Sequence, residues 1–168
     1  GYCHEVGHSR PTCTTRKQEV STITASTLEF RKKVAQRMTD ENFGPGALVE
    51  VGSNPPRMGV VTKVALDEVA TSNKVKTDSP FGSCNSIHVQ YVVPFKQYGR
   101  EYQDVRVSMP YRFLNTEDYD RSAWYRNPSD QPFTVLSTTD ISEATLVGDS
   151  LDENKVKKWV LTNIVDPK

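Results

Sequence analysis

Three potential metal ligands lie within the first thirteen residues, and their spacing constrains the fold more than any other feature of the chain. Cys3, His8 and Cys13 are each separated by four residues, and Gly7 directly precedes the histidine. Thiolate and imidazole groups bind structural zinc, usually as four ligands arranged in a tetrahedron. A segment this short has almost no apolar core, so we expect metal binding to supply the free energy that folds it.

The spacing resembles the CCHC zinc knuckle of nucleocapsid-type proteins, whose pattern is Cys, two residues, Cys, four residues, His, four residues, Cys. The match covers the last three ligands and two neighbouring positions, namely Tyr2, Cys3, Gly7, His8 and Cys13. The family's first cysteine would fall one place before Gly1. Either a cysteine there completes the site, or the site is vestigial, or His4 or water takes the fourth position.

The resemblance also implies a ligand for the knuckle. Zinc knuckles of this family bind single-stranded RNA or DNA, stacking bases on exposed aromatic rings while arginine and lysine hold the backbone. In this chain Tyr2 would stack on bases, and the phosphate contacts would come from the nearby cations Arg10, Arg16 and Lys17. Knuckles of this kind also dock on proteins, so a protein partner is expected as well.

Charge is unevenly distributed along the chain. The 21 basic and 21 acidic residues balance overall, but residues 1–38 contain seven Lys or Arg against three Glu. A basic end on a mildly acidic body is typical of a protein that touches phosphates through one end, although a solvated tail and helix face would give the same excess. No apolar run or signal sequence indicates a membrane, so we expect a soluble protein, either intracellular or within a virion.

The chain is predicted to have four parts. These are a zinc knuckle, an extended linker, an amphipathic helix and a β-barrel-like domain with a C-terminal extension, over residues 1–13, 14–25, 26–43 and 44–168. Ser26-Thr27-Leu28-Glu29 has the form of a capping box, which predicts the helix start. An apolar stripe through Phe30, Val34 and Met38 faces a core, and Arg31 is expected on the solvent side.

The remainder of the chain reads as short strands separated by turn residues. Strands are predicted at residues 46–51, 58–64, 87–93, 102–109, 133–136 and 144–147. A Gly-led strand, a loop and a Gly-Val-Val strand resemble the start of an SH3-like barrel of the KOW, Tudor or CAP-Gly kind, over about residues 44–115. Residues 152–166 favour a helix behind an Asp cap, although residues 159–165 are also rich in β-formers. The predicted fold class is therefore mainly β with few helices (α+β), ending in a C-terminal helix.

No constellation of residues indicates catalysis. Two of the three histidines lie in the candidate metal-binding segment. The third, His88, has Cys84 four residues before it but no acidic residue at a spacing typical of a catalytic site. No phosphate-binding glycine loop, nucleophile elbow or zinc-protease helix motif occurs. We therefore expect a protein that is not an enzyme and has no small-molecule substrate.

A second candidate surface combines aromatic and cationic side chains, namely Arg121, Trp124, Tyr125 and Arg126. Such a group suits either base stacking or an interface hot spot, whereas Trp124 would alternatively close one end of the barrel. Two functions follow. One is a non-enzymatic protein that binds single-stranded nucleic acid and docks on a larger complex; the other is a structural assembly protein, such as a virion component. A short knuckle on a compact β domain is similar to small zinc-knuckle proteins encoded by large tailed phages.

Overall fold

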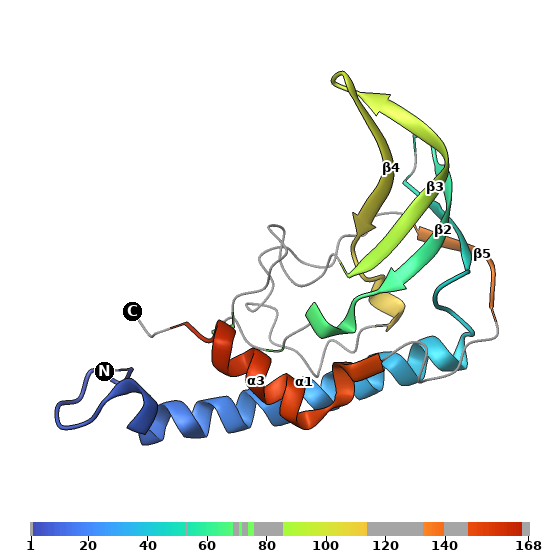
Figure 1. The fold of residues 1–168 in the computed structure, drawn as a ribbon. Helices are drawn as coiled ribbons and strands as arrows, with labels where there is room; N and C mark the ends of the chain where they lie inside the picture. The colour runs from blue at the N-terminus through green and yellow to red at the C-terminus, as the bar shows by residue number, and fades with distance from the viewer. Residues whose placement is uncertain are drawn as a thin grey trace.

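The computed structural model describes residues 2–52, 54–68, 71, 74–75, 86–113, 133–139 and 148–165. Within these residues the chain forms two helices and one five-stranded antiparallel sheet, which confirms the mixed α+β class. The sheet stands at one end of the long helix α1, and the shorter helix α3 lies along the other part of α1 (Figure 1). The strand predicted at residues 144–147 and the surface around Arg121, Trp124, Tyr125 and Arg126 lie outside the described residues.

Helix α1, Thr14–Asp40, is the longest element and begins directly after Cys13. The extended linker predicted for residues 14–25 is therefore wrong, as is the helix start at Ser26. These residues are rich in Thr and Ser, which have low helix propensity, but Val20 and Ile23 bury their side chains against other elements. Burial of an amphipathic face contributes more to helix stability than intrinsic propensity does, so packing decides the conformation here.

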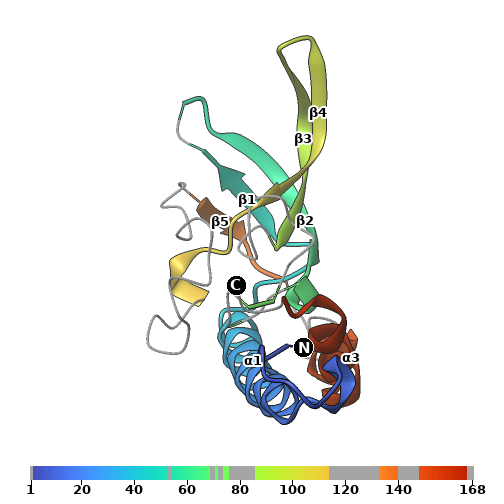
Figure 2. The same cartoon turned by 90° about the vertical axis from the view of Figure 1, so that its left-hand side faces the viewer.

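Helix α3, Glu153–Asn163, confirms the predicted C-terminal helix. Its N-cap is Asp152, whose carboxylate accepts a hydrogen bond from the Lys155 backbone N–H at 3.0 Å. Helices α1 and α3 lie side by side, with the N-terminal segment at their shared end (Figure 2). Between them lies a small core, called here the helical cluster, formed by Tyr2, Cys13, Val20, Ile23, Val75, Val156, Val160 and Ile164.

The five strands follow the order β4-β3-β2-β1-β5. Their bounds are β1 Leu48–Val51, β2 Arg57–Val64, β3 Ile87–Gln97, β4 Arg100–Val107 and β5 Phe133–Ser137. Strands β4 and β5 lie at opposite ends of the sheet, and closure would require hydrogen bonds between them. The SH3-like barrel predicted from the sequence is therefore not formed by the described strands, which make an open sheet.

The main core lies between the C-terminal half of α1 and one face of the sheet. The predicted apolar stripe of α1 is confirmed, because Phe30, Val34 and Met38 are each at most 1% exposed. They pack with alternate residues of the strands, including Val49 and Val89. The main core and the helical cluster thus occupy different lengths of one continuous helix.

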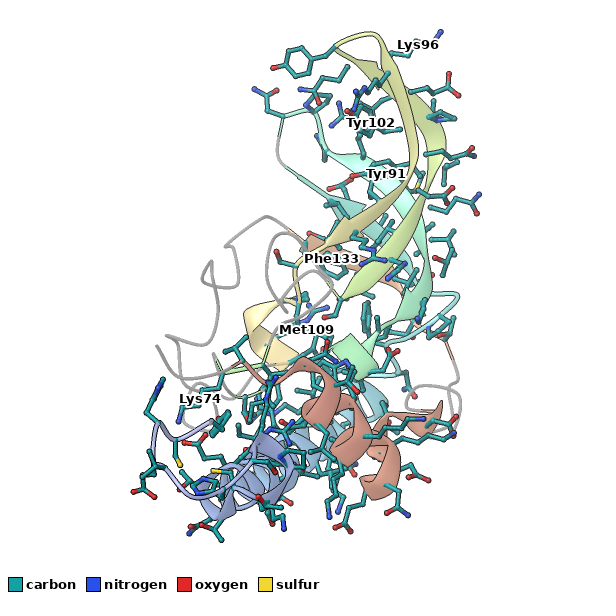
Figure 3. All side chains as sticks on the ribbon, turned by 60° about the vertical axis from the view of Figure 1, so that its left-hand side comes forward. Lys74, Tyr91, Lys96, Tyr102, Met109 and Phe133 are labelled. Carbon is teal, nitrogen blue, oxygen red and sulfur yellow. The ribbon has the colours of Figure 1, made fainter. Side chains whose placement is uncertain are left out.

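The β3–β4 hairpin projects beyond the other strands (Figures 1 and 3). Tyr98 and Gly99 form its two-residue turn, both with positive φ angles of 51° and 75°, as hairpin turns of this length require. The ring of Phe95 stacks on that of Tyr102 at a centroid separation of 5.1 Å. Phe95 also contacts Arg57, whose guanidinium lies 3.8 Å from the Phe95 ring centroid. This aromatic packing supports the hairpin where it leaves the main core.

Candidate metal centre

Cys3, His8 and Cys13 converge at the N-terminal end of α1. Their two sulfur atoms and one ring nitrogen all lie within 4.8 Å of one another, so the group could hold a metal ion. The Sγ of Cys3 and the Nε2 of His8 are 3.1 Å apart. A tetrahedral zinc site places neighbouring ligand atoms about 3.5 to 3.8 Å apart, given its usual bond lengths. The observed arrangement needs only small side-chain movements to reach that geometry.

The backbone between the ligands reverses direction to bring them together. His4 and Gly7 both have positive φ angles, 62° and 97°, a conformation that glycine adopts without steric cost. A short 3-10 turn, Arg10–Thr12, then leads into Cys13. It is stabilised by a hydrogen bond from the Ser9 backbone N–H to the Thr12 hydroxyl at 3.0 Å. These local turns bring the three side chains to one place.

Cys13 is both a ligand of the group and the N-cap of α1. Its Sγ accepts a hydrogen bond from the Arg16 backbone N–H at 3.5 Å. That hydrogen bond lowers the pKa of the Cys13 thiol to about 7; burial opposes the shift, and hydrogen bonds to Cys3 and His8 reinforce it. Because the thiolate is the form that binds metals, a lowered pKa reduces the proton loss that metal binding requires near neutral pH.

The described residues supply three ligands and no fourth. His4, one of the alternatives considered from the sequence, is not part of the group that converges. The carboxylate of Glu5 approaches Cys3, with 3.9 Å between Oε2 and Sγ. A tetrahedral site would therefore need a fourth ligand that does not yet converge with these three in the described residues.

Tyr2 does not have the position that base stacking requires. Its side chain is 0% exposed and belongs to the helical cluster, and its hydroxyl donates a hydrogen bond to the Glu19 carboxylate. Base stacking on Tyr2 therefore stays a prediction that would require its side chain to leave this buried position. Tyr2 instead packs with Cys13 in the helical cluster.

Arg10 and Arg16 contact the end of α3. The Arg16 Nη2 donates to the Leu161 carbonyl at 3.1 Å, and the Arg10 Nη2 donates to the Ile164 carbonyl at 3.4 Å. The last carbonyls of a helix lack partners within the helix and carry partial negative charge, so cationic donors stabilise them. Of the three cations predicted to contact phosphate, Arg10 thus joins the N-terminal segment to α3, Arg16 joins the first turn of α1 to α3, and Lys17 is exposed.

An ion pair that the sequence did not indicate lies beside Tyr2, between Glu19 of α1 and Lys74. The Lys74 Nζ lies 2.5 Å from the Glu19 Oε1, and Figure 3 shows Lys74 beside the N-terminal segment. Burial raises the pKa of Glu19, but hydrogen bonds from Lys74 and Tyr2 outweigh it and lower the pKa below the ordinary 4.5. Partners 17 and 55 residues from Glu19 leave no short-range pattern by which to predict them.

Arg31 forms a second polar link between helices. It was expected on the solvent side of α1, yet it is 1% exposed and donates to the carbonyls of Ser150 at 2.8 Å and Asp67 at 2.9 Å. Its guanidinium also lies 5.1 Å from the Trp159 ring centroid. Burial lowers the pKa of Arg31 to about 10, an effect that the charge of Asp67 partly offsets. Arg31 therefore remains cationic at neutral pH and holds three separate segments together.

Comparisons with models of protein families, with curated proteins and with solved structures find no match to this chain. In the part of the chain that the structure describes, no helix has the length and apolarity needed to cross a bilayer. The function is therefore argued from the geometry of the candidate metal centre and its surroundings.

Proposed function

We propose that Cys3, His8 and Cys13 bind one zinc ion with a structural role, and that the protein is a non-catalytic component of a larger assembly. One observation supports this most directly: the ligand group is attached to both helices. Cys13 caps α1, and Arg10 and Arg16 donate to the final carbonyls of α3. An ion held there would fix the N-terminal segment against the helix pair.

The donor set favours zinc over harder cations. Two thiolates and one imidazole suit zinc, whereas magnesium and calcium prefer oxygen ligands. Cys13 is 1% exposed and Cys3 is half-buried, which suits a structural rather than an open catalytic site. Of the carboxylates described near the group, Glu19 is engaged by Lys74 and Tyr2, and Glu5 is exposed with its Oε2 3.9 Å from the Cys3 Sγ.

The geometry gives little support to single-stranded nucleic acid, the first of the two functions expected from the sequence, which leaves the assembly role as our proposal. Of the four residues expected to bind nucleic acid, Tyr2 is buried and Arg10 and Arg16 are directed at α3. Lys17 alone among them is exposed without such a contact in the described residues. Since affinity for a polynucleotide grows with the number of neutralised phosphates, one cation supplies little binding.

Metal analysis of the purified full chain tests the metal centre. We expect one zinc ion per chain, and loss of that ion in Cys13→Ser and His8→Ala. His4→Ala is the matched control, because His4 lies in the same segment outside the converging group, and it should retain the ion. A Cys13→Ser variant with full zinc content would exclude the proposed ligand set.

Oligonucleotide titration separates the two functions. We expect the zinc-loaded chain to show no detectable binding to single-stranded RNA or DNA even at low salt. Binding that weakens steeply as salt rises, and that Lys17→Ala reduces, would favour the nucleic-acid function instead, because counterion release produces that salt dependence. The metal analysis is independent of this outcome.

A further inference from the structure

The outer edge of β4 is a candidate interaction surface. β4 is the terminal strand of the sheet, and among the described strands it pairs only with β3. Half of the backbone N–H and C=O groups of such a strand point away from its neighbour and can pair with another strand. β4 belongs to the hairpin, whose turn end projects beyond the other described strands (Figures 1 and 2).

The sequence of this edge combines charge with an absence of lysine and proline. Natural edge strands are protected by short length, charged side chains, proline or bulges. β4 spans Arg100–Val107, has four charged residues but no lysine or proline, and its pairing with β3 shifts register between Gln90 and Phe95. Its charges are of both signs, with Arg100 and Asp104 both exposed. Among the described residues neither side chain forms an ion pair. Between them lies Tyr102, half-buried by stacking on Phe95.

We propose that two copies of this chain associate by antiparallel pairing of their β4 strands about a two-fold axis at Tyr102. In this register Tyr102 faces Tyr102 of the second copy. Arg100 faces the second copy's Asp104, and by symmetry Asp104 faces its Arg100. Glu101 faces Gln103. Opposite charges and aromatic rings placed directly across an antiparallel pair stabilise it, so every cross-strand pair near the axis is favourable or neutral.

Symmetry restricts the alternatives. Residues opposite each other must point to the same face, and a two-fold axis perpendicular to the sheet preserves the faces, so the axis has to pass at a residue. An axis at Gln103 would place Arg100 opposite Arg106, and an axis at Asp104 would place two carboxylates together. An axis at Val105 would pair Asp104 with Arg106, but Val105 packs against the main core and Arg106 already interacts within its own chain.

This inference rests on the proposed assembly role and names a second copy as one partner. Sedimentation equilibrium of the zinc-loaded full chain should show a concentration-dependent dimer. Arg100→Asp and Asp104→Arg each place like charges together at two symmetric positions, and each should lower the association constant by about tenfold or more. The double variant restores opposite charges and should restore the dimer. Lys63→Glu, an exposed charge reversal on β2, is the control and should leave it unchanged.

Cross-linking tests the register. Residues opposite each other in antiparallel strands have Cα atoms about 4.5 to 5.5 Å apart, which is within reach of a disulfide bond. Tyr102→Cys should therefore form a disulfide-linked dimer on mild oxidation, whereas Ser137→Cys on β5 at the other end of the sheet should not. Efficient cross-linking through Val105→Cys instead would contradict the Tyr102 axis.

A monomer at all concentrations, or a dimer insensitive to the charge changes, would overturn the self-pairing. Either result would leave the zinc centre and assembly through other partners standing, because those depend on residues at the opposite end of the molecule. A chain that contains no zinc but still forms the dimer would contradict the metal centre and leave the self-pairing standing.

Discussion

At the residue scale, single side chains join parts of the chain that are far apart in the sequence. The group of Cys3, His8 and Cys13 that could hold a metal ion could be predicted, because its spacing is local and its chemistry is specific. The roles of Arg10 and Arg16 could not, because their carbonyl partners lie 154 and 145 residues away. In the sequence, a basic residue close to these cysteines looks identical whether its side chain contacts a phosphate or the end of a helix.

Replacing Arg16 should separate its role from that of its neighbour. Arg16→Ala removes the donor to the Leu161 carbonyl and should lower the free energy of unfolding by about 1 kcal/mol, the scale of a charged group at a helix C-terminus. Lys17→Ala removes an exposed charge and should change it by less than about 0.5 kcal/mol. Urea unfolding of both variants in the zinc-loaded form checks this. Equal losses would contradict the role of Arg16 at α3.

Glu19 should make stability fall in acid. Its pKa is lowered in the fold by Lys74 and Tyr2 despite the opposing effect of burial, so the folded state favours the carboxylate. The resulting stabilisation is complete above the ordinary pKa of 4.5 and is lost as the pH falls through the lowered pKa. Thermal unfolding from pH 6 downward should show a smaller acid-dependent loss in Glu19→Gln than in the wild type, with both proteins held metal-free to exclude ligand protonation. Identical pH profiles would contradict the assignment.

At the element scale, most strands and the C-terminal helix could be predicted because turn residues and alternation are local signals. The N-terminal part of α1 was missed because Val20 and Ile23 are its main apolar residues before Thr27, and because its N-cap is a cysteine. The capping-box pattern at Ser26 predicted a helix start, but α1 is already continuous through this residue. The sheet stays open because β5 pairs with β1. These two strands are about half the chain apart in the sequence, so no local pattern predicts their pairing.

Close approach of β2 and β3 depends on a glycine. A Cβ at position 59 would lie 2.4 Å from the Val89 Cγ1 and 2.9 Å from the Gln90 carbonyl oxygen. Because part of this clash is with the backbone of a central strand, Gly59→Ala should lower the free energy of unfolding by about 2 kcal/mol, as overpacking does. Lys63→Ala on the same strand is the exposed control. Urea unfolding in which both variants match the wild type would show that the sheet can adjust.

At the scale of the whole molecule, the buried side chains in the described part of the chain form two clusters joined by one helix. The helical cluster depends on the N-terminal segment, which contributes Tyr2 and Cys13, whereas the main core is built from the sheet and the C-terminal half of α1. Metal binding should therefore act mainly on the first cluster.

Removal of zinc should loosen one part of the molecule selectively. Since the ion stabilises only the conformation that gathers its ligands, chelation should speed amide hydrogen exchange in residues 14–25 and in α3. Exchange in residues 87–91 of β3 should change little. Cys13→Ser should reproduce the pattern without chelator. Uniform acceleration over the whole chain would indicate one cooperative unit, and no change would show that the ion is not structural.

The continuity of α1 also sets a length. With 27 residues and a rise of about 1.5 Å per residue, it is a rod of about 40 Å. Its two ends carry different attachments, the segment with Cys3, His8 and Cys13 at one and the sheet at the other (Figure 1). If each end binds a separate neighbour, the protein acts as a rigid spacer. The distance between those neighbours then depends on the number of turns in α1 and not on a flexible linker.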